Sequence, residues 1–395
     1  MREYARSQEQ EREFVIGGFR NFGKGAAVME LPADMIGNGW EEDLQRQRQK
    51  NRVPVSVRWE VPANNPVLAR RVVQLNVWAE NMEKLFFGRF SIDNLSLEEI
   101  SLINAMGLPG AEDLNMLDSL KKFNEWVELV RKNTEYWMSD YVKSPEQYGS
   151  LGRFQCMAMM TVLQKYLGVR YKKSFSEGDY DPRDSRSLFL HGILGGHGGA
   201  CVSLPTLFCA VGRRLGYPLF LVQAKEHIFI RWDDKRSGER FNFDGTSQGF
   251  GERDDNYYRY RPAPLMAEDL IRFPRYLKNV ETRKKEMAIM LGERAQCLQY
   301  NLHLMEACMA CYYANLADPD NRLLQENWAL TSLLYEAFDA AHTAAKTRNQ
   351  THYRLQDVQL QPSSEPWKRT AFHVANGLLH SIKKLYPSDH RIQIA

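Results

Sequence analysis

The sequence has no long hydrophobic run and no strong excess of charge of either sign. None of its apolar stretches approaches the roughly 20 residues that a membrane-spanning helix requires. Its 52 Lys and Arg residues nearly balance its 49 Asp and Glu residues, which leaves a formal charge of +3. This balance argues against a surface built for nucleic acid or for an anionic membrane. We therefore expect neither nucleic acid nor a membrane among its partners.

The N-terminus and the cysteines exclude further classes of protein. The first residues, MREYARSQEQEREF, are charged and lack the apolar centre of a secretory signal. Six cysteines in 395 residues, without the close spacing of a disulfide-rich scaffold, are typical of a reducing compartment. These features predict a cytoplasmic protein, although an effector exported without a cleaved signal would share them.

Length and composition indicate a folded protein with more than one domain. At about 100–200 residues per domain, the chain has room for two or three. Its hydrophobic fraction of 44% is ordinary for a soluble globular protein. The pattern along the chain predicts four regions: a polar N-terminal arm over residues 1–62, a helical region over 63–168, a mixed core over 169–262 and a C-terminal helical region over 263–395.

Helix signals recur between residues 65 and 168. Asn65 and Pro66 supply an N-cap and a favoured first helical residue. Ser96 and Glu99 have the spacing of a capping box. A longer apolar face runs over residues 112–141 and predicts a third helix.

The most informative stretch is a glycine-rich turn that contains a cysteine. Cys201 follows GGHGGA and precedes a segment with helical spacing, in which Pro205 fits only in the first turn. We therefore expect the helix to begin at or just before Cys201 and to end near Gly216. The positive end of a helix lowers the pKa of a thiol, as a cysteine nucleophile requires.

Three predicted strands follow this helix. PLFLVQA and HIFIRW are apolar and are joined by the short connection Lys225-Glu226, and RFNF returns after a polar hairpin. His227 begins the second strand, and Asp244 directly follows the third. A nucleophile at a helix start, with a base and a carboxylate on neighbouring strands, is an arrangement that allows thiolate, imidazole and carboxylate to align.

Four short blocks in this order resemble the transglutaminase-like superfamily, a group with a papain-like cysteine fold. The blocks are GACVS around Cys201, RLGYP, HIFI from His227 and DGT from Asp244, and they lie within roughly residues 185–260. The chain is most similar to bacterial members with a helical, tetratricopeptide-like tail. The resemblance implies an α+β fold, in which the cysteine helix packs on a small antiparallel sheet within a mostly helical chain. It also implies Cys201 as nucleophile, His227 as general base and acid, and Asp244 as the residue that orients the imidazole.

Two features depart from the family pattern. Gly245 stands where a proline is common, and no tryptophan lies just upstream of Cys201 to complete an oxyanion hole. The backbone N–H of Cys201 and a glutamine, Gln155 or Gln223, are candidates for that role. His197 is a candidate substrate contact because it lies close to the cysteine in sequence.

Such a site predicts a cysteine-dependent amide hydrolase or acyltransferase without a cofactor or metal. Attack on an amide carbonyl of a protein or peptide gives a thioester, which water hydrolyses or an amine converts into a crosslink. The resemblance to bacterial members favours peptidase or amidase activity over crosslinking. Tyr257, Tyr258 and Tyr260, which follow the last block, are expected at the rim of the substrate cleft.

Two other interpretations remain open. In the first, the core has become structural and the C-terminal helices bind a protein partner. In the second, His191, His197 and Cys201 bind zinc, although a fourth ligand at a characteristic spacing is missing. Buried cysteines, core histidines and turn-capping aspartates are each common, and the ordered combination of the three is what favours catalysis.

Overall fold

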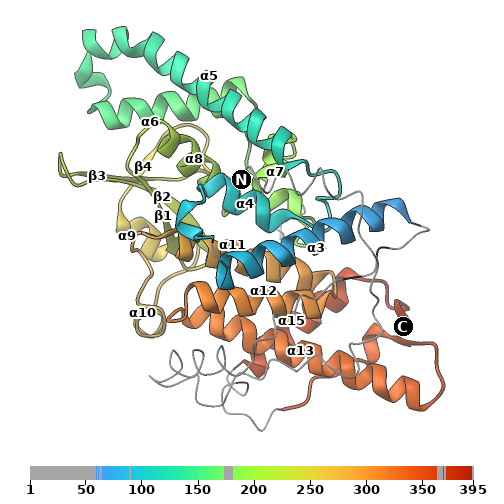
Figure 1. The fold of residues 1–395 in the computed structure, drawn as a ribbon. Helices are drawn as coiled ribbons and strands as arrows, with labels where there is room; N and C mark the ends of the chain where they lie inside the picture. Colours follow the sequence, from blue (N-terminus) through green and yellow to red (C-terminus); the bar gives the residue numbers. More distant parts are fainter. Residues whose placement is uncertain are drawn as a thin grey trace.

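A computed structural model describes residues 59, 61, 65–88, 90–172, 181–362, 368 and 371–393. The predicted N-terminal arm over residues 1–62 lies outside this part of the chain, apart from Trp59 and Val61. In Figure 1 a helical hairpin of α5 and α6 projects at one end of the molecule, the sheet lies below it, and the C-terminal helices form the other end.

The described residues between 65 and 168 are mostly helical, as the helix signals there predict. Its elements are α3 (Pro66–Phe87), η2 (Ile92–Asn94), α4 (Leu97–Ala105), α5 (Met116–Lys143), η3 (Pro145–Gln147), α6 (Leu151–Thr161) and the π-helix η4 (Val162–Tyr166). The side chain of Asn65 caps α3, and Ser96 and Glu99 make both bonds of a capping box. α5 begins later than residue 112 because the Asn115 side chain accepts hydrogen bonds from the first backbone N–H groups of the helix.

A four-stranded antiparallel sheet forms the centre of the fold. The strands are β1 (Leu219–Ala224), β2 (His227–Asp234), β3 (Glu239–Phe243) and β4 (Glu252–Arg253), in that spatial order. One face packs on α8 (Ser203–Arg214), where Leu221 and Ile230 join the main hydrophobic core. On the other face Phe229 stacks on Tyr258 of α9 (Asp255–Tyr260). The predicted α+β class, with the cysteine helix on a small antiparallel sheet, is confirmed.

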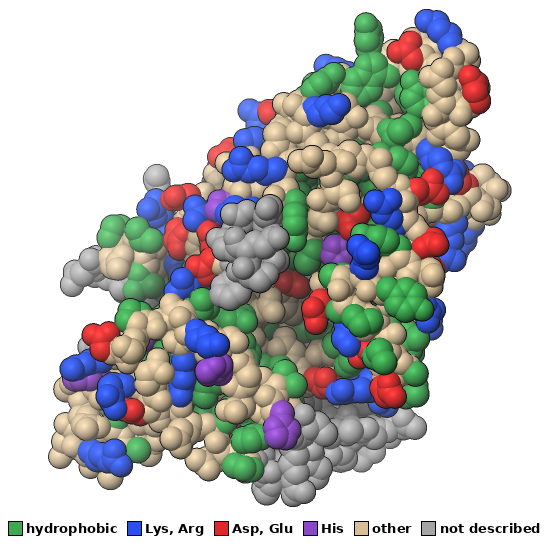
Figure 2. Space-filling view, turned by 180° about the vertical axis from the view of Figure 1, so that it is seen from behind, with side chains coloured by type: hydrophobic (Ala, Val, Ile, Leu, Met, Phe, Trp, Pro, Cys, Tyr) green, Lys and Arg blue, Asp and Glu red, His purple; other side chains and the backbone are tan. Residues whose placement is uncertain are grey.

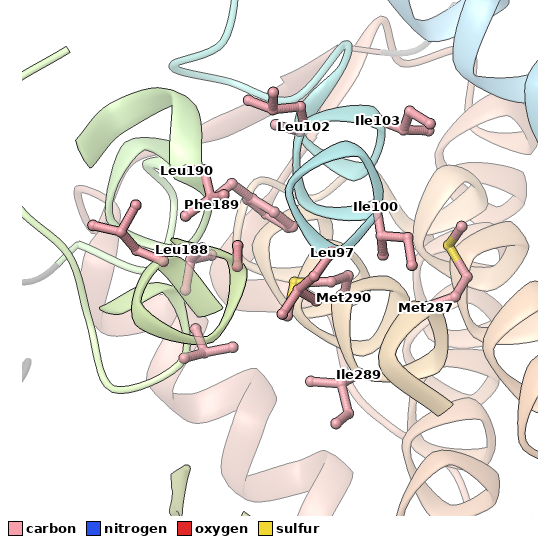
Figure 3. Close-up of a cluster of buried hydrophobic side chains, with 14 of the residues drawn as sticks. Leu97, Ile100, Leu102, Ile103, Leu188, Phe189, Leu190, Met287, Ile289 and Met290 are labelled. Atoms are coloured by element: carbon pink, nitrogen blue, oxygen red, sulfur yellow. The ribbon is translucent and has the colours of Figure 1, made fainter. Parts of the chain in front are cut away.

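The segment that leads to the cysteine turn is anchored in the main core. It contains η6 (Ser185–Ser187) and α7 (Leu190–Leu194). Figure 3 shows Leu188, Phe189 and Leu190 gathered with side chains of α4, such as Leu97, and of α11 (Arg283–Tyr300), such as Met290. All five side chains are buried, so the approach to Cys201 rests on two helices that are distant from it in sequence.

The C-terminal region is mostly helical. Its further elements are α10 (Ala267–Arg272), α12 (Leu304–Ala317), α13 (Arg322–Thr347), β5 (His352–Arg354), η7 (Leu355–Asp357), α15 (Phe372–Leu385) and β6 (Arg391–Gln393). α11 packs on α12, α12 on α13, and α13 on α15. Leu334 and Phe338 of α13 join Leu379 of α15 in a second hydrophobic cluster. The tetratricopeptide-like character of this region stays a prediction.

The surface agrees with the balanced charge of the sequence. Figure 2 shows Lys and Arg side chains interspersed with Asp and Glu side chains over one face of the molecule. Among the described helices, none combines the length and the apolar character needed to cross a membrane.

Candidate active site

Cys201 lies in the turn that leads directly into α8. The regular helix begins at Ser203, two residues later than the expected start, although the N–H of Leu204 already donates to the carbonyl of Ala200 at 3.1 Å. The Ser203 hydroxyl donates to the carbonyl oxygen of Ser187 at 2.6 Å and accepts from the N–H of Ala200 at 2.9 Å. These bonds tie the cysteine turn to the anchored segment.

The glycines before Cys201 allow the backbone of the turn to pass close to the backbone of residues 170–172. Gly198 has a φ of +91°, in the region that favours glycine. The N–H of Gly199 donates to the carbonyl of Arg170 at 3.0 Å, and its own carbonyl accepts from the N–H of Lys172 at 2.8 Å. The glycine-rich turn therefore runs directly beside residues 170–172, which fixes the path of the chain into the site.

His227 and Asp244 form a buried imidazole–carboxylate pair. Nε2 of His227 lies 2.8 Å from Oδ2 of Asp244, and the two side chains are 10% and 11% exposed. The other carboxylate oxygen accepts from the N–H of Thr246 at 2.9 Å and from its hydroxyl at 2.7 Å. Burial acts to raise the pKa of Asp244, but the hydrogen bonds from His227 and Thr246 outweigh it and hold that pKa below its usual range. The carboxylate is therefore ionised and held in one orientation.

Tyr258 supports the imidazole from one side. Its ring stacks on that of His227, with centroids 6.1 Å apart and planes inclined by 18°, and it also stacks on Phe229. Tyr258 is fully buried, so the expectation of a rim position is wrong for this residue, whereas Tyr260 is exposed. A buried aromatic ring therefore borders the imidazole on one side.

Gly245 brings the Asp244 turn against the start of α8. A Cβ at this position would lie 3.1 Å from the backbone nitrogen of Pro205 and 3.1 Å from Cδ2 of Phe208. Any larger residue would therefore need the turn or the helix to shift. The glycine that departs from the family pattern thus allows the aspartate turn to approach the helix that follows Cys201.

Replacing Gly245 with alanine is expected to lower the free energy of unfolding by about 1–3 kcal/mol, because the added methyl group meets backbone as well as a side chain. Urea unfolding followed by circular dichroism measures this loss. Gly377→Ala is the matched control, since a Cβ at Gly377 on α15 has nothing within 4 Å. Equal stability of the two variants would contradict the close approach at Gly245.

The thiol of Cys201 is not acidified in the structure. Burial raises its pKa to about 12, and the carboxylates of Glu293 and Asp244 act in the same direction. The prediction that the helix start lowers this pKa is therefore wrong for the protein without substrate. No hydrogen bond joins Sγ of Cys201 to the ring of His227, both of which the structure describes. The thiol is neutral at rest, so a proton has to leave it during any reaction.

Among the described residues, none of the other candidate side chains makes a hydrogen bond to the thiol, and their roles stay predictions. Gln155 lies on α6 and Gln223 on β1, and within the described residues neither side chain makes a hydrogen bond. Gln223 borders a cavity of about 310 Å³ that is also lined by Arg231. Nε2 of His197 lies 2.7 Å from Nζ of Lys172.

The alternative zinc site does not assemble in the described part of the chain. Nε2 of His191 lies 3.3 Å from the carbonyl oxygen of Gly110 and 3.4 Å from Oγ of Ser185. Burial lowers the pKa of His191 to about 4, so its ring is neutral at neutral pH. No three His, Cys, Asp or Glu side chains of the described residues are grouped to hold a metal ion.

Gln164 holds the loop that follows Asp244, a contact that the sequence patterns do not reveal. It lies on the π-helix η4, where its Nε2 donates to the carbonyl of Ser247 and its Oε1 accepts from the N–H of Gly249, both at 2.8 Å. The two bonds hold the loop that follows Asp244. A π-helix often marks a functional site, but it is defined by backbone geometry and has no sequence signature.

A cysteine at the start of a helix, packed on an antiparallel sheet that carries an imidazole–carboxylate pair, is the arrangement of papain-like folds. The family model described as the transglutaminase-like superfamily matches residues 120–284. The chain therefore contains a transglutaminase-like domain, and the resemblance of the four sequence blocks is confirmed. No curated protein and no solved structure matches the chain.

Proposed function

We propose that the protein is a cysteine-dependent amide hydrolase or acyltransferase that works through a thioester. The observation that supports this function is the His227–Asp244 pair, with 2.8 Å between Nε2 and Oδ2. Asp244 lies on a turn that Gly245 packs against the cysteine helix. An ionised carboxylate at Nε2 fixes the tautomer and leaves Nδ1 to receive a proton.

In the proposed reaction His227 acts first as base and then as acid. Sγ of Cys201 forms a bond to the amide carbonyl carbon while the thiol proton passes to Nδ1 of His227. Asp244 stabilises the imidazolium. When the carbon–nitrogen bond breaks, His227 gives the proton to the leaving amine, and water then hydrolyses the thioester by the same route. Because the resting thiol is neutral, proton transfer accompanies the attack, and no thiolate–imidazolium pair precedes it.

Hydrolysis is favoured over crosslinking on the basis of the resemblance to bacterial members. The test is to incubate the protein with a peptide amide in the presence and absence of excess primary amine, and to identify products by mass spectrometry. We expect the carboxylic acid as the main product in both conditions, and no product with Cys201→Ala. A dominant amine-exchange product would show an acyltransferase instead.

A second candidate function is a non-catalytic scaffold that binds a protein partner through its helical regions. Two observations favour it: the raised pKa of the Cys201 thiol and the absence of a hydrogen bond between that thiol and His227, two described residues. This candidate predicts that Cys201→Ala and His227→Ala bind the partner as well as the wild type does. It also predicts that none of the three proteins, the wild type included, hydrolyses amides.

A further inference from the structure

Another cavity lies in the C-terminal region, between the end of α13 and the ribbon formed by β5 and β6. Its volume is about 420 Å³, a size that suits a small molecule. In Figure 1 the C-terminal end of α13 and the sheet that carries His227 lie at opposite sides of the molecule. The cavity is therefore separate from the candidate active site, and the proposed function gives it no role.

The charged groups that line this cavity are mostly positive. They are Arg348 at the end of α13, Arg354 on β5, Arg391 on β6 and Asp357 of η7. Three guanidiniums and one carboxylate leave the lining with an excess of two positive charges. A cavity with such a lining attracts anions.

Two of these arginines stand opposite each other on the ribbon. Arg354 of β5 pairs with Arg391 of β6 in the antiparallel register. Residues directly opposite on neighbouring strands have their side chains close together on one face, and like charges in these positions are destabilising. The ribbon thus concentrates positive charge at the cavity at a cost in stability, and a bound anion would offset that cost.

Only one of the three guanidiniums is neutralised by a described residue. Nε and Nη2 of Arg354 donate to the two carboxylate oxygens of Asp357 at 2.9 and 2.8 Å. Nη1 of Arg391 instead donates to Nε2 of His352 at 2.7 Å, and an imidazole that accepts this bond is neutral. The histidine orients Arg391 without cancelling its charge. Arg348 and Arg391 make no ion pair within the described part of the chain.

The side of the cavity that α13 forms is apolar. It consists of Ala341, Ala344 and Ala345, which are three and four positions apart and so lie on one face of the helix. Their methyl groups leave the space in front of this face open. A ligand can therefore place an uncharged group against α13 while its anionic end meets the arginines.

We propose that this cavity binds a small organic phosphate, whose phosphate group is held by Arg348 and Arg391. A phosphate monoester carries a charge of about −2 at neutral pH, which matches the uncompensated charge of the lining. A carboxylate would neutralise only half of that charge. Planar guanidiniums also bind phosphate oxygens through paired hydrogen bonds, an arrangement that a lysine ammonium does not offer.

Isothermal titration calorimetry of the full-length protein with phenyl phosphate tests this proposal without any measurement of catalysis. Two comparison ligands are used at the same ionic strength: benzoate keeps the ring but has a single charge, and inorganic phosphate keeps the charged group without the ring. We expect saturable binding of phenyl phosphate and much weaker binding of both other ligands. Arg348→Gln and Arg391→Gln should each weaken the binding of phenyl phosphate by about tenfold or more.

Arg322→Gln is the matched control, because Arg322 is an exposed arginine at the other end of α13 and its loss should leave the affinity unchanged. Arg348→Lys gives a second reading if Arg391→Gln disturbs the ribbon: it keeps the charge and should bind phenyl phosphate with an affinity between those of the wild type and Arg348→Gln. Unfolding of each variant without ligand checks that it is folded.

Three results would overturn the proposal. The first is the absence of saturable binding of phenyl phosphate to the wild type. The second is equal affinity for phenyl phosphate in the wild type, Arg348→Gln and Arg391→Gln. The third is binding of benzoate or of inorganic phosphate as tight as that of phenyl phosphate, since the cavity would then not select an organic phosphate.

Discussion

For a peptide amide that the wild type hydrolyses, the rate of hydrolysis is expected to fall by roughly 10³-fold or more in Cys201→Ala and in His227→Ala. Loss of the thiol removes the atom that forms the thioester. Loss of the imidazole leaves a thiol whose pKa is about 12 without a base to receive its proton. Initial rates of amide cleavage at neutral pH measure both effects.

The double variant gives a sharper result. Because the two groups act in one step, Cys201→Ala combined with His227→Ala should be no slower than either single variant. Cys308→Ala is the control, since Cys308 is also partly accessible but lies on α12. Activity that survives in Cys201→Ala, or is lost in Cys308→Ala, would assign the nucleophile elsewhere.

Asp244→Asn should reduce activity by roughly 10²–10⁴-fold while leaving the fold intact. An amide at this position no longer stabilises the imidazolium and can hold the ring in the wrong tautomer. A comparison of kcat and KM measures the loss, which should appear mainly in kcat because the carboxylate bonds to His227 and Thr246 and acts through the imidazole.

The same substitution has a pH-dependent effect on stability. The pKa of Asp244 is lower in the folded protein than its ordinary value, so the ionised carboxylate stabilises the fold above that ordinary value. This contribution is lost as the pH falls through the folded-state pKa. Asp244→Asn should therefore be less stable than the wild type at neutral pH and approach it in acid. Asp320→Asn, at a mostly exposed carboxylate, should follow the wild type throughout, and a constant difference for Asp244→Asn would contradict the assignment.

Local patterns in the sequence were sufficient to predict the elements that carry the site. The strands that begin with His227 and end before Asp244 have alternating apolar residues and clear turns, and both strands form as expected. The capping box of Ser96 and Glu99 is equally local and is present with both bonds. Such features depend on residues only a few positions apart, so a single sequence contains the information needed to place them.

The electrostatic state of the site could not be predicted in the same way. The pKa of Cys201 depends on its burial and on the charge of Glu293, which comes from a helix far along the chain. The packing of Tyr258 beneath His227 and the two bonds of Gln164 also depend on tertiary contacts. A helix start predicts a lowered thiol pKa when considered by itself, but burial and two carboxylates outweigh it here.

The most direct test of the central claim is to trap an acyl group on the enzyme. The protein is mixed with an activated ester such as p-nitrophenyl acetate, quenched in acid at short times and mapped by mass spectrometry. We predict a thioester on Cys201 in the wild type, none at Cys308, and a strongly reduced amount in His227→Ala. Equal acylation of Cys201 and Cys308, unchanged by the loss of His227, would show that Cys201, His227 and Asp244 do not work as a catalytic unit.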